Sequence, residues 1–229
     1  PMHQHPSASS TPTSQLLGLA AALRRNGGRL ALFAVVCTAL IAITDYFTRD
    51  VIARQAEQQL QQTLQQMLPA HSYDNDLAGS CILLQNREYL GNDAPHPVYV
   101  ARQGDRISGY IVESVAPNGY SGAIRLLSAV TADGKVSRVQ VLEHHETPGL
   151  GDKIERSKSS WIDHFTGQHL NGRSDSRWAV RKDGGEFDSF TGATITPRAV
   201  VGGVRAVLLL IQEHPELLTS GQPCPHAAE

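Results

Sequence analysis

The stretch LALFAVVCTALIAIT, residues 30–44, contains no charged residue. With its flanks it is about 21 residues long, and a helix of that length rises about 30 Å, enough to cross the hydrocarbon core of a bilayer. A signal-peptide core and a buried core helix are the competing interpretations, because the strictly uncharged part has only about 15 residues. No small-residue cleavage site follows it. We therefore predict one transmembrane helix over residues 29–48.

Arginines flank this run unevenly. Arg24, Arg25 and Arg29 precede it, whereas Arg49 alone follows it closely. Positively charged flanks are retained preferentially in the cytoplasm. We therefore predict a cytoplasmic, partly disordered tail over residues 1–28 and an extracytoplasmic location for everything after the span.

The composition of the whole chain narrows the classes of function. The 229 residues carry a net charge of −2, with 41% hydrophobic and 18% charged positions, as in ordinary folded proteins. Without an extended basic surface, nucleic acid is not expected as a partner. Cys37, Cys81 and Cys224 form no C-x-x-C pair, which argues against zinc and iron–sulfur sites. Cys81 and Cys224 can pair if both lie outside the cytoplasm, but their spacing does not decide it.

A helical pattern follows the predicted span. Ile52, Ala56, Leu60, Leu64 and Leu68 recur every four residues among glutamines, up to a proline at position 69. This spacing predicts an amphipathic linker helix over residues 49–70, whose apolar stripe packs against the domain that it carries.

The following residues have a β-rich pattern. Short runs at 80–84, 98–101, 107–112, 124–130 and 136–142 are bounded by turn residues. Gly104 and the Asp133-Gly134 pair are suited to hairpin turns, so we expect mainly antiparallel pairing. Residues 154–169 favour a shorter helix. The fold class is therefore α+β, with a domain over residues 71–218 and a loose tail over 219–229.

A last helix is indicated near the C-terminus. Thr196 followed by Pro197 is typical of an N-cap and a first helical turn, and apolar residues keep helical spacing from there to His214. Just before it, the run DSFTGATIT at residues 188–196 offers several hydroxyls beside two small residues. The free N–H groups of the helix start would favour a phosphate there. On these grounds alone, however, a plain helix cap is the better explanation.

The same run resembles the flavinylation signature of the FMN-binding domain family. The matching residues are Thr191-Gly192-Ala193-Thr194, with Asp188 three residues before them and Thr196 two residues after. In that family the last threonine of the four carries FMN through a phosphoester bond, which a flavin transferase makes outside the cytoplasm. The resemblance therefore implies FMN covalently bound to Thr194.

Two further segments are similar to segments of that family. ETPGLG at residues 146–151 resembles the segment that lines the flavin, and NGYSG at 118–122 resembles a turn that precedes a strand. Ala123 departs from the proline expected there, and Phe190 and Pro197 are less usual neighbours of the motif. The cofactor-binding residues that the resemblance implies are Thr194 and, around it, Asp188, Thr191, Gly192, Ala193, Thr196, Tyr120, Ser121, Glu146, Thr147, Gly149, Leu150 and Gly151.

The position of the flavin ring is a separate expectation. We expect it between the turn at residues 149–151 and the turn at 119–121, whose glycines allow close backbone approach. Leu150 would then cover one face of the ring.

The family includes the G subunit of Rnf electron-transport complexes and the C subunit of the sodium-translocating NADH:quinone reductase, and the order of motifs is more similar to the former. The resemblance implies an electron relay in a complex of the bacterial inner membrane that couples electron transfer from NADH or ferredoxin to ion translocation. The implied partners are other subunits, the flavin transferase and the lipid bilayer. An FMN-containing sensor module and a structural subunit with an unmodified threonine are the alternatives.

Other candidate sites are weaker. Adjacent His144 and His145 would point to opposite faces of a strand, so they make a poor shared metal site. Ser121 and Ser189 lie in no Gly-x-Ser-x-Gly nucleophile turn. Two tryptophans, at positions 161 and 178, are expected in the core or at the membrane interface rather than stacked on a flavin.

Overall fold

A computed structural model describes residues 12–225 of the chain, with side chains described at 27–48, 55 and 57–225. The described chain divides into two units between residues 57 and 58, so that they contain residues 12–57 and 58–225. Part of the predicted tail, residues 1–11, lies outside the described residues, as do residues 226–229.

The N-terminal unit is helical. Helix α1 runs over Pro12–Met67, 56 residues without a break. From residue 12 on, the segments that we predicted as tail, span and linker form one helix. No proline follows Pro12 until position 69, and alanine, leucine and glutamine, which favour helices, dominate the segment.

One part of α1 has the properties of a membrane anchor. Among the described residues, Gly27–Thr48 and Ile195–Glu213 are helical segments long and apolar enough to cross a bilayer, but more than half of the second is buried in the domain. In the first segment the apolar side chains are exposed, with Phe33 at 69% and Ile41 at 71%. An aqueous surface would not favour such exposure, so this segment indicates a single membrane anchor.

The second unit contains a six-stranded antiparallel sheet in the order β5-β4-β3-β2-β1-β6. This confirms the predicted antiparallel pairing. Gly104 and Gly134, both with positive φ, make the turns between β2 and β3 and between β4 and β5. The strands are β1 (Cys81–Leu84), β2 (His96–Gln103), β3 (Arg106–Ala116), β4 (Ile124–Thr131), β5 (Val136–Glu143) and β6 (Gln222–Pro223).

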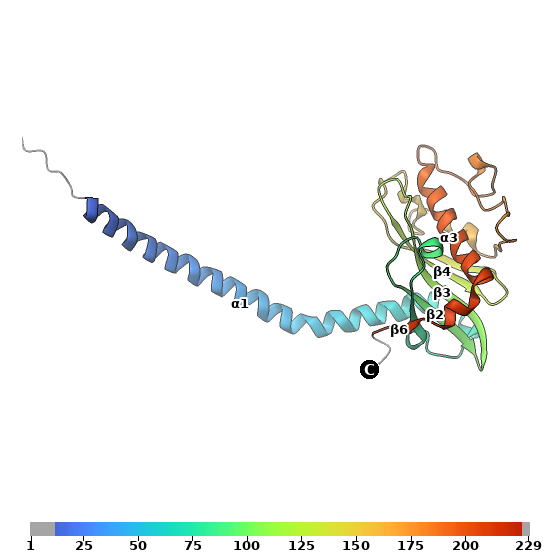
Figure 1. Ribbon diagram of the computed structural model, residues 1–229, viewed down its shortest axis with the longest axis horizontal. Helices are drawn as coiled ribbons and strands as arrows, with labels where there is room; N and C mark the ends of the chain where they lie inside the picture. The colour runs from blue at the N-terminus through green and yellow to red at the C-terminus, as the bar shows by residue number, and fades with distance from the viewer. Residues whose placement is uncertain (1–11, 226–229) are drawn as a thin grey trace, which may run out of the picture. The chain divides into compact units, whose positions relative to one another are not determined.

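Helices complete the unit. The long helix α3 (Ile195–Glu213) lies across one face of the sheet beside β3 and β4 (Figure 1). The apolar side of α3 packs there in the main core, which contains Val200, Val204 and Leu208. The remaining helices are short: α2 (Arg87–Leu90), η1 (Ala70–Ser72), η2 (Ala78–Ser80), η3 (Asp152–Ile154), η4 (Trp161–Phe165), η5 (Arg181–Asp183) and η6 (Pro215–Thr219).

A smaller core covers the other face of the sheet. Neighbouring strand residues separate accordingly, with Val112 in the main core and Ile111 in the smaller one. The C-terminal end of α1 contributes Leu64, Met67 and Leu68 to this smaller core. The predicted packing of the apolar stripe is therefore confirmed for its described last turns.

Two expectations were wrong. Residues 154–169 do not form one helix, because only the short 3₁₀ helices η3 and η4 occur there. Residues 219–225 are not loose, because β6 pairs with β1 and Cys224 forms a disulfide with Cys81, with a Cα–Cα distance of 5.4 Å. This pairing joins positions 143 residues apart, which local sequence patterns do not reveal.

An aromatic cluster holds the chain around the start of residues 188–196, which we call the flavin motif. Trp161 packs edge-on against Phe190 at a centroid distance of 5.2 Å, and Phe165 stacks on Phe187 at 4.6 Å. Trp161 and Trp178 are 6% and 5% exposed, so both belong to the core. The cluster anchors the chain directly ahead of the motif.

Candidate functional site

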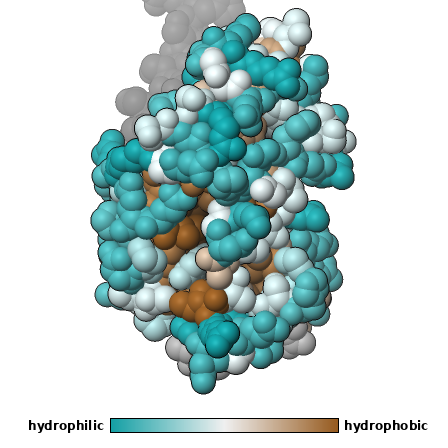
Figure 2. Space-filling view, turned by 90° about the vertical axis from the view of Figure 1, so that its right-hand side faces the viewer, coloured by the Kyte–Doolittle hydropathy of each residue, from teal (hydrophilic) through white to brown (hydrophobic). Residues whose placement is uncertain are grey.

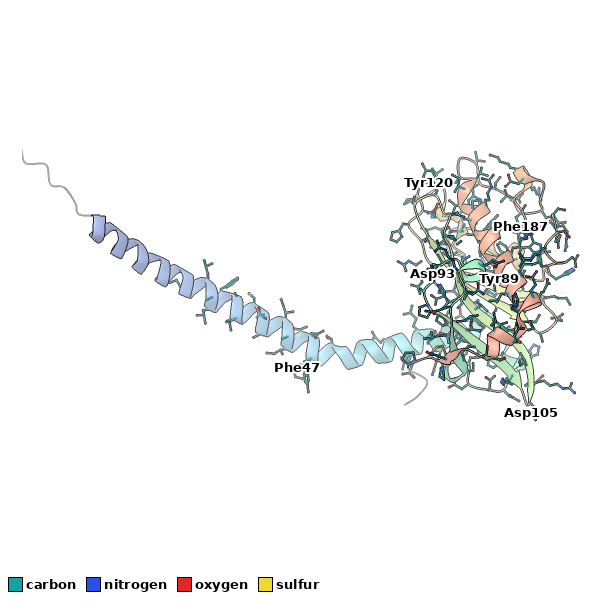
Figure 3. The ribbon with its side chains drawn as sticks, viewed as in Figure 1. Phe47, Tyr89, Asp93, Asp105, Tyr120 and Phe187 are labelled. Atoms are coloured by element: carbon teal, nitrogen blue, oxygen red, sulfur yellow. A yellow bond between two sulfur atoms is a disulfide. The ribbon has the colours of Figure 1, made fainter. Side chains whose placement is uncertain are left out.

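The three motifs meet at the carboxylate of Glu146, which is only 5% exposed. The Ser121 backbone N–H donates to Glu146 Oε1 at 3.0 Å, and the Thr196 hydroxyl donates to Glu146 Oε2. Figure 3 places Tyr120 and Asp105 at opposite ends of the domain, as expected for residues on either side of β3. The site therefore lies at the end of the sheet remote from the β2–β3 hairpin.

The glycines of two motifs make room for this carboxylate. A Cβ atom at Gly119 would lie 2.9 Å from Glu146 Oε1, and one at Gly151 would lie 2.9 Å from Glu146 Oε2. Both contacts are too close, so only glycine allows the turns to close around Glu146. Glu146 thus occupies the space between the two turns in which we expected the flavin ring. A ring bound to these turns would have to lie on their outer side.

His144 holds the backbone of Glu146. Its Nδ1 accepts the Glu146 N–H at 3.0 Å, and its Nε2 bonds Glu155 Oε1 at 2.7 Å. The first bond needs a free lone pair on Nδ1, so the geometry assigns the proton to Nε2. The hydrogen bond from His144 lowers the pKa of Glu155 below its usual value. Sequence reasoning weighed His144 only as a metal ligand and missed this positioning role.

The residues before Thr194 form a tight turn. The Ala193 N–H donates to the Phe190 carbonyl at 3.1 Å, and Gly192 has a φ of +82°. Glycine is favoured at such an angle, as in the third position of a type II turn. A Cβ atom at Gly192 would lie 3.6 Å from Leu150 Cδ2, so Leu150 packs over the turn. The hexapeptide at residues 146–151 and the flavin motif are thereby in contact.

Thr194 is the N-cap residue of α3. Its side chain makes no capping bond, and its hydroxyl instead accepts a hydrogen bond from Lys182 Nζ at 2.9 Å. The predicted N-cap, Thr196, was wrong: it lies inside the first turn and is fully buried. Thr194 already has helical angles, so the helix starts earlier than predicted and turns Thr196 toward Glu146.

Charged residues of η5 form ion pairs with residues at both ends of the motif. Arg181 Nε lies 3.0 Å from an oxygen of Asp188, and Arg198 in the first turns of α3 binds Asp183 through two bonds of 2.6 and 2.8 Å. The bidentate contact with Arg198 lowers the pKa of Asp183. The predicted site residue Asp188 is therefore engaged within the loop. Lys182 was missed, although its position in a charged triplet before two glycines is a visible signal.

The remaining predicted residues have less specific surroundings. Thr147 is exposed, and its carbonyl accepts the Leu150 and Gly151 N–H groups at 3.1 and 3.0 Å, which closes the turn. Thr191 and Gly149 are exposed, and Gly149 has open space around it.

Apolar side chains of the three motifs and of the start of α3 remain at the surface. Tyr120 is 68% exposed, Leu150 43% and Ile195 44%. Ile195 also lines a groove of about 740 Å³ that runs beside α3, with Asn118 and Gly202 among its other lining residues. On the face shown in Figure 2, the domain is mainly hydrophilic and its apolar residues form small patches.

These features fit a phosphate-linked flavin. An accessible hydroxyl lies at a helix N-terminus, a cation is in contact with it, and exposed apolar side chains lie nearby. An anion at the hydroxyl would meet positive charge from both sources.

Comparisons with known proteins identify the family of the chain. Residues 119–209 match the model of the FMN-binding domain, and residues 17–67 match that of the RnfG N-terminal region. The chain is 50% identical over 202 residues to the G subunit of the ion-translocating oxidoreductase complex of Yersinia pestis, a match that covers 88% of this chain and 96% of the relative. The corresponding protein of Escherichia coli O157:H7 is 49% identical over 202 residues, covering 88% and 97%.

Together, the two models cover the anchor and most of the motif-bearing domain, and the relatives are matched over almost their whole length. The chain therefore belongs to the family of the G subunits of ion-translocating oxidoreductase complexes, and contains its FMN-binding domain.

Proposed function

We propose that this chain carries FMN through a phosphoester bond to Thr194 and relays electrons within a membrane-bound complex that couples electron transfer to ion translocation. The observation that carries the proposal is the position of the Thr194 hydroxyl. It lies at the start of α3, bonded to Lys182 and next to the turn that Leu150 covers.

The proposed electron transfer depends on the cofactor. When bound, FMN accepts and donates one or two electrons. The chain's residues would anchor and orient it. A covalent bond prevents loss of the cofactor, so retention does not depend on affinity.

The ring is proposed to lie on the outer side of the two turns. Leu150 and Tyr120 are the exposed apolar side chains of these turns and offer it a surface. Glu146 then supports the ring indirectly, by holding Ser121 and Thr196 in place.

The site is proposed to face the periplasm, with the N-terminus of the chain in the cytoplasm. The disulfide between Cys81 and Cys224 supports this orientation, because disulfides persist in oxidising compartments and are rare in the cytosol. The three arginines before the apolar segment favour the same orientation.

Intact mass of the full chain, produced together with a flavin transferase, tests the proposal. The wild-type chain is expected to gain roughly 440 Da and to fluoresce in a denaturing gel, because the modification is covalent. Thr194→Ala should lose both signals, whereas Thr166→Ala, at an exposed threonine outside the motif, is the control and should keep them. A flavin that stays on the denatured Thr194→Ala chain would contradict the proposal.

A further inference from the structure

Each of the three residues of η5 contacts a different residue in the flavin motif or just after it. Arg181 pairs with Asp188, the first residue of the motif, and Asp183 pairs with Arg198, two residues after its end. Lys182, between them, donates to the Thr194 hydroxyl at 2.9 Å. The two outer ion pairs hold η5 across the motif, and they thereby direct the central lysine at the modified position.

The charges of the neighbouring arginines are already matched. Arg198 makes two hydrogen bonds to the Asp183 carboxylate, and Arg181 contacts the carboxylate of Asp188. Among the described residues, Lys182 forms no ion pair, although its positive charge helps to lower the pKa of Asp183. The atom that it bonds is a neutral hydroxyl oxygen. An ammonium group beside a hydroxyl at a helix N-terminus adds positive charge where the helix is already positive. Such an arrangement favours an anion at Thr194.

We propose that Lys182 is a positioning residue that pairs with the phosphodiester formed at Thr194; this inference rests on the function proposed above. Once linked, the phosphate keeps one negative charge and sits directly on the oxygen that Lys182 contacts. The ammonium group neutralises that charge and fixes the direction in which the bound flavin extends from Thr194. Lysine acts here as a point charge, so arginine can replace its charge, although the geometry of its head group differs.

The exposure of Lys182 sets the size and the salt dependence of the effect. Its side chain is exposed, so water and salt screen the attraction. We expect flavin attachment to raise the Tm of the wild-type chain by about 1–4 °C at low salt, and less at high salt. Without the lysine, the rise should largely disappear.

The experiment compares flavin-bearing and unmodified forms of the full chain in detergent, for the wild type, Lys182→Met, Lys182→Arg and Lys158→Met. Lys158 is an exposed lysine outside the site and serves as the control. Mass gives the flavin content, and thermal unfolding at low and high salt gives the rise in Tm on attachment. The wild type, Lys182→Arg and Lys158→Met should show a salt-sensitive rise, and Lys182→Met should not.

Each result decides between the two proposals. A flavin-bearing Lys182→Met chain with the wild-type rise in Tm would overturn the role of Lys182 while leaving the flavin carrier intact. A wild-type chain that carries no flavin would overturn both. If Lys182→Met folds but does not load flavin, loading of Lys182→Arg supports the charge interaction, and failure of both variants to load contradicts it.

Discussion

The hydroxyl of Thr196 donates a hydrogen bond to the carboxylate of Glu146, 50 residues earlier in the chain. This bond joins the start of α3 to the turns at residues 119–121 and 149–151, which surround Glu146. Thr196 is fully buried and Glu146 nearly so. Because a buried carboxylate needs its partners, the pair determines how the flavin motif sits on the domain.

Replacing Thr196 by valine should therefore lower stability. The valine keeps the shape of the side chain but leaves Glu146 with one donor fewer, which costs about 1–3 kcal/mol of unfolding free energy. Urea unfolding would measure it. Thr166→Val, at an exposed threonine, is the control and should change little. An equal loss in both variants would show that the buried bond contributes nothing specific.

Removing the disulfide should destabilise the extramembrane domain. The bond closes a loop that spans a sequence separation of 143 residues and attaches β6 to β1. Because the unfolded chain gains freedom when this constraint is lost, the free energy of unfolding should fall by about 2–5 kcal/mol. Cys224→Ala, or reduction of the wild type, should show it in denaturant unfolding, and Cys37→Ala should not. An unchanged midpoint after complete reduction would count against this expectation.

Two adjacent glycines of α3 should respond differently to alanine. A Cβ atom at Gly202 meets nothing within 4 Å, whereas one at Gly203 would lie 3.1 Å from Ala116 Cβ and Leu126 Cδ1. Gly202→Ala should raise the unfolding free energy by about 0.5–1 kcal/mol, since glycine is unfavourable within a helix. In Gly203→Ala, crowding against β3 and β4 should cancel or reverse that gain. Equal gains in both variants would mean that β3 and β4 shift to make room for the methyl group without any loss of unfolding free energy.

Asp175 should make stability depend on acid pH. Hydrogen bonds from the Arg177 side chain lower the pKa of Asp175 from 3.8 to about 2. The ionised form therefore favours the folded state: its contribution is complete above about pH 4 and is lost as the pH falls toward 2. Melting temperatures from pH 6 to pH 2 should fall more steeply for the wild type than for Asp175→Asn. Parallel curves would rule out this contribution.

Local patterns in the sequence determined the elements that the chain forms. The uncharged run predicted the exposed apolar segment of α1, and alternating β-rich runs with Gly104 and Gly134 predicted hairpins that occur. These features depend on neighbouring residues, which is why pattern and turn chemistry reveal them. Residues 154–169 were mispredicted, because their apolar residues enter an aromatic cluster without a continuous helix.

The resemblance to a family singled out Thr194 and its neighbours, but it did not say what each residue contacts. The contacts of Glu146 with Ser121 and Thr196, and of Lys182 with Thr194, join residues between 12 and 50 positions apart. The pairing of Cys81 with Cys224 is more distant still.

The sequence by itself thus determined the anchor and the antiparallel domain, because these follow from the periodicity and chemistry of adjacent residues, and its resemblance to a family located the motif. Only the tertiary structure decided that Glu146 fills the space between two turns, that Thr196 faces it rather than capping α3, and that Lys182 reaches Thr194. Those relationships depend on how separate segments pack around a shared core, and no local pattern records that packing.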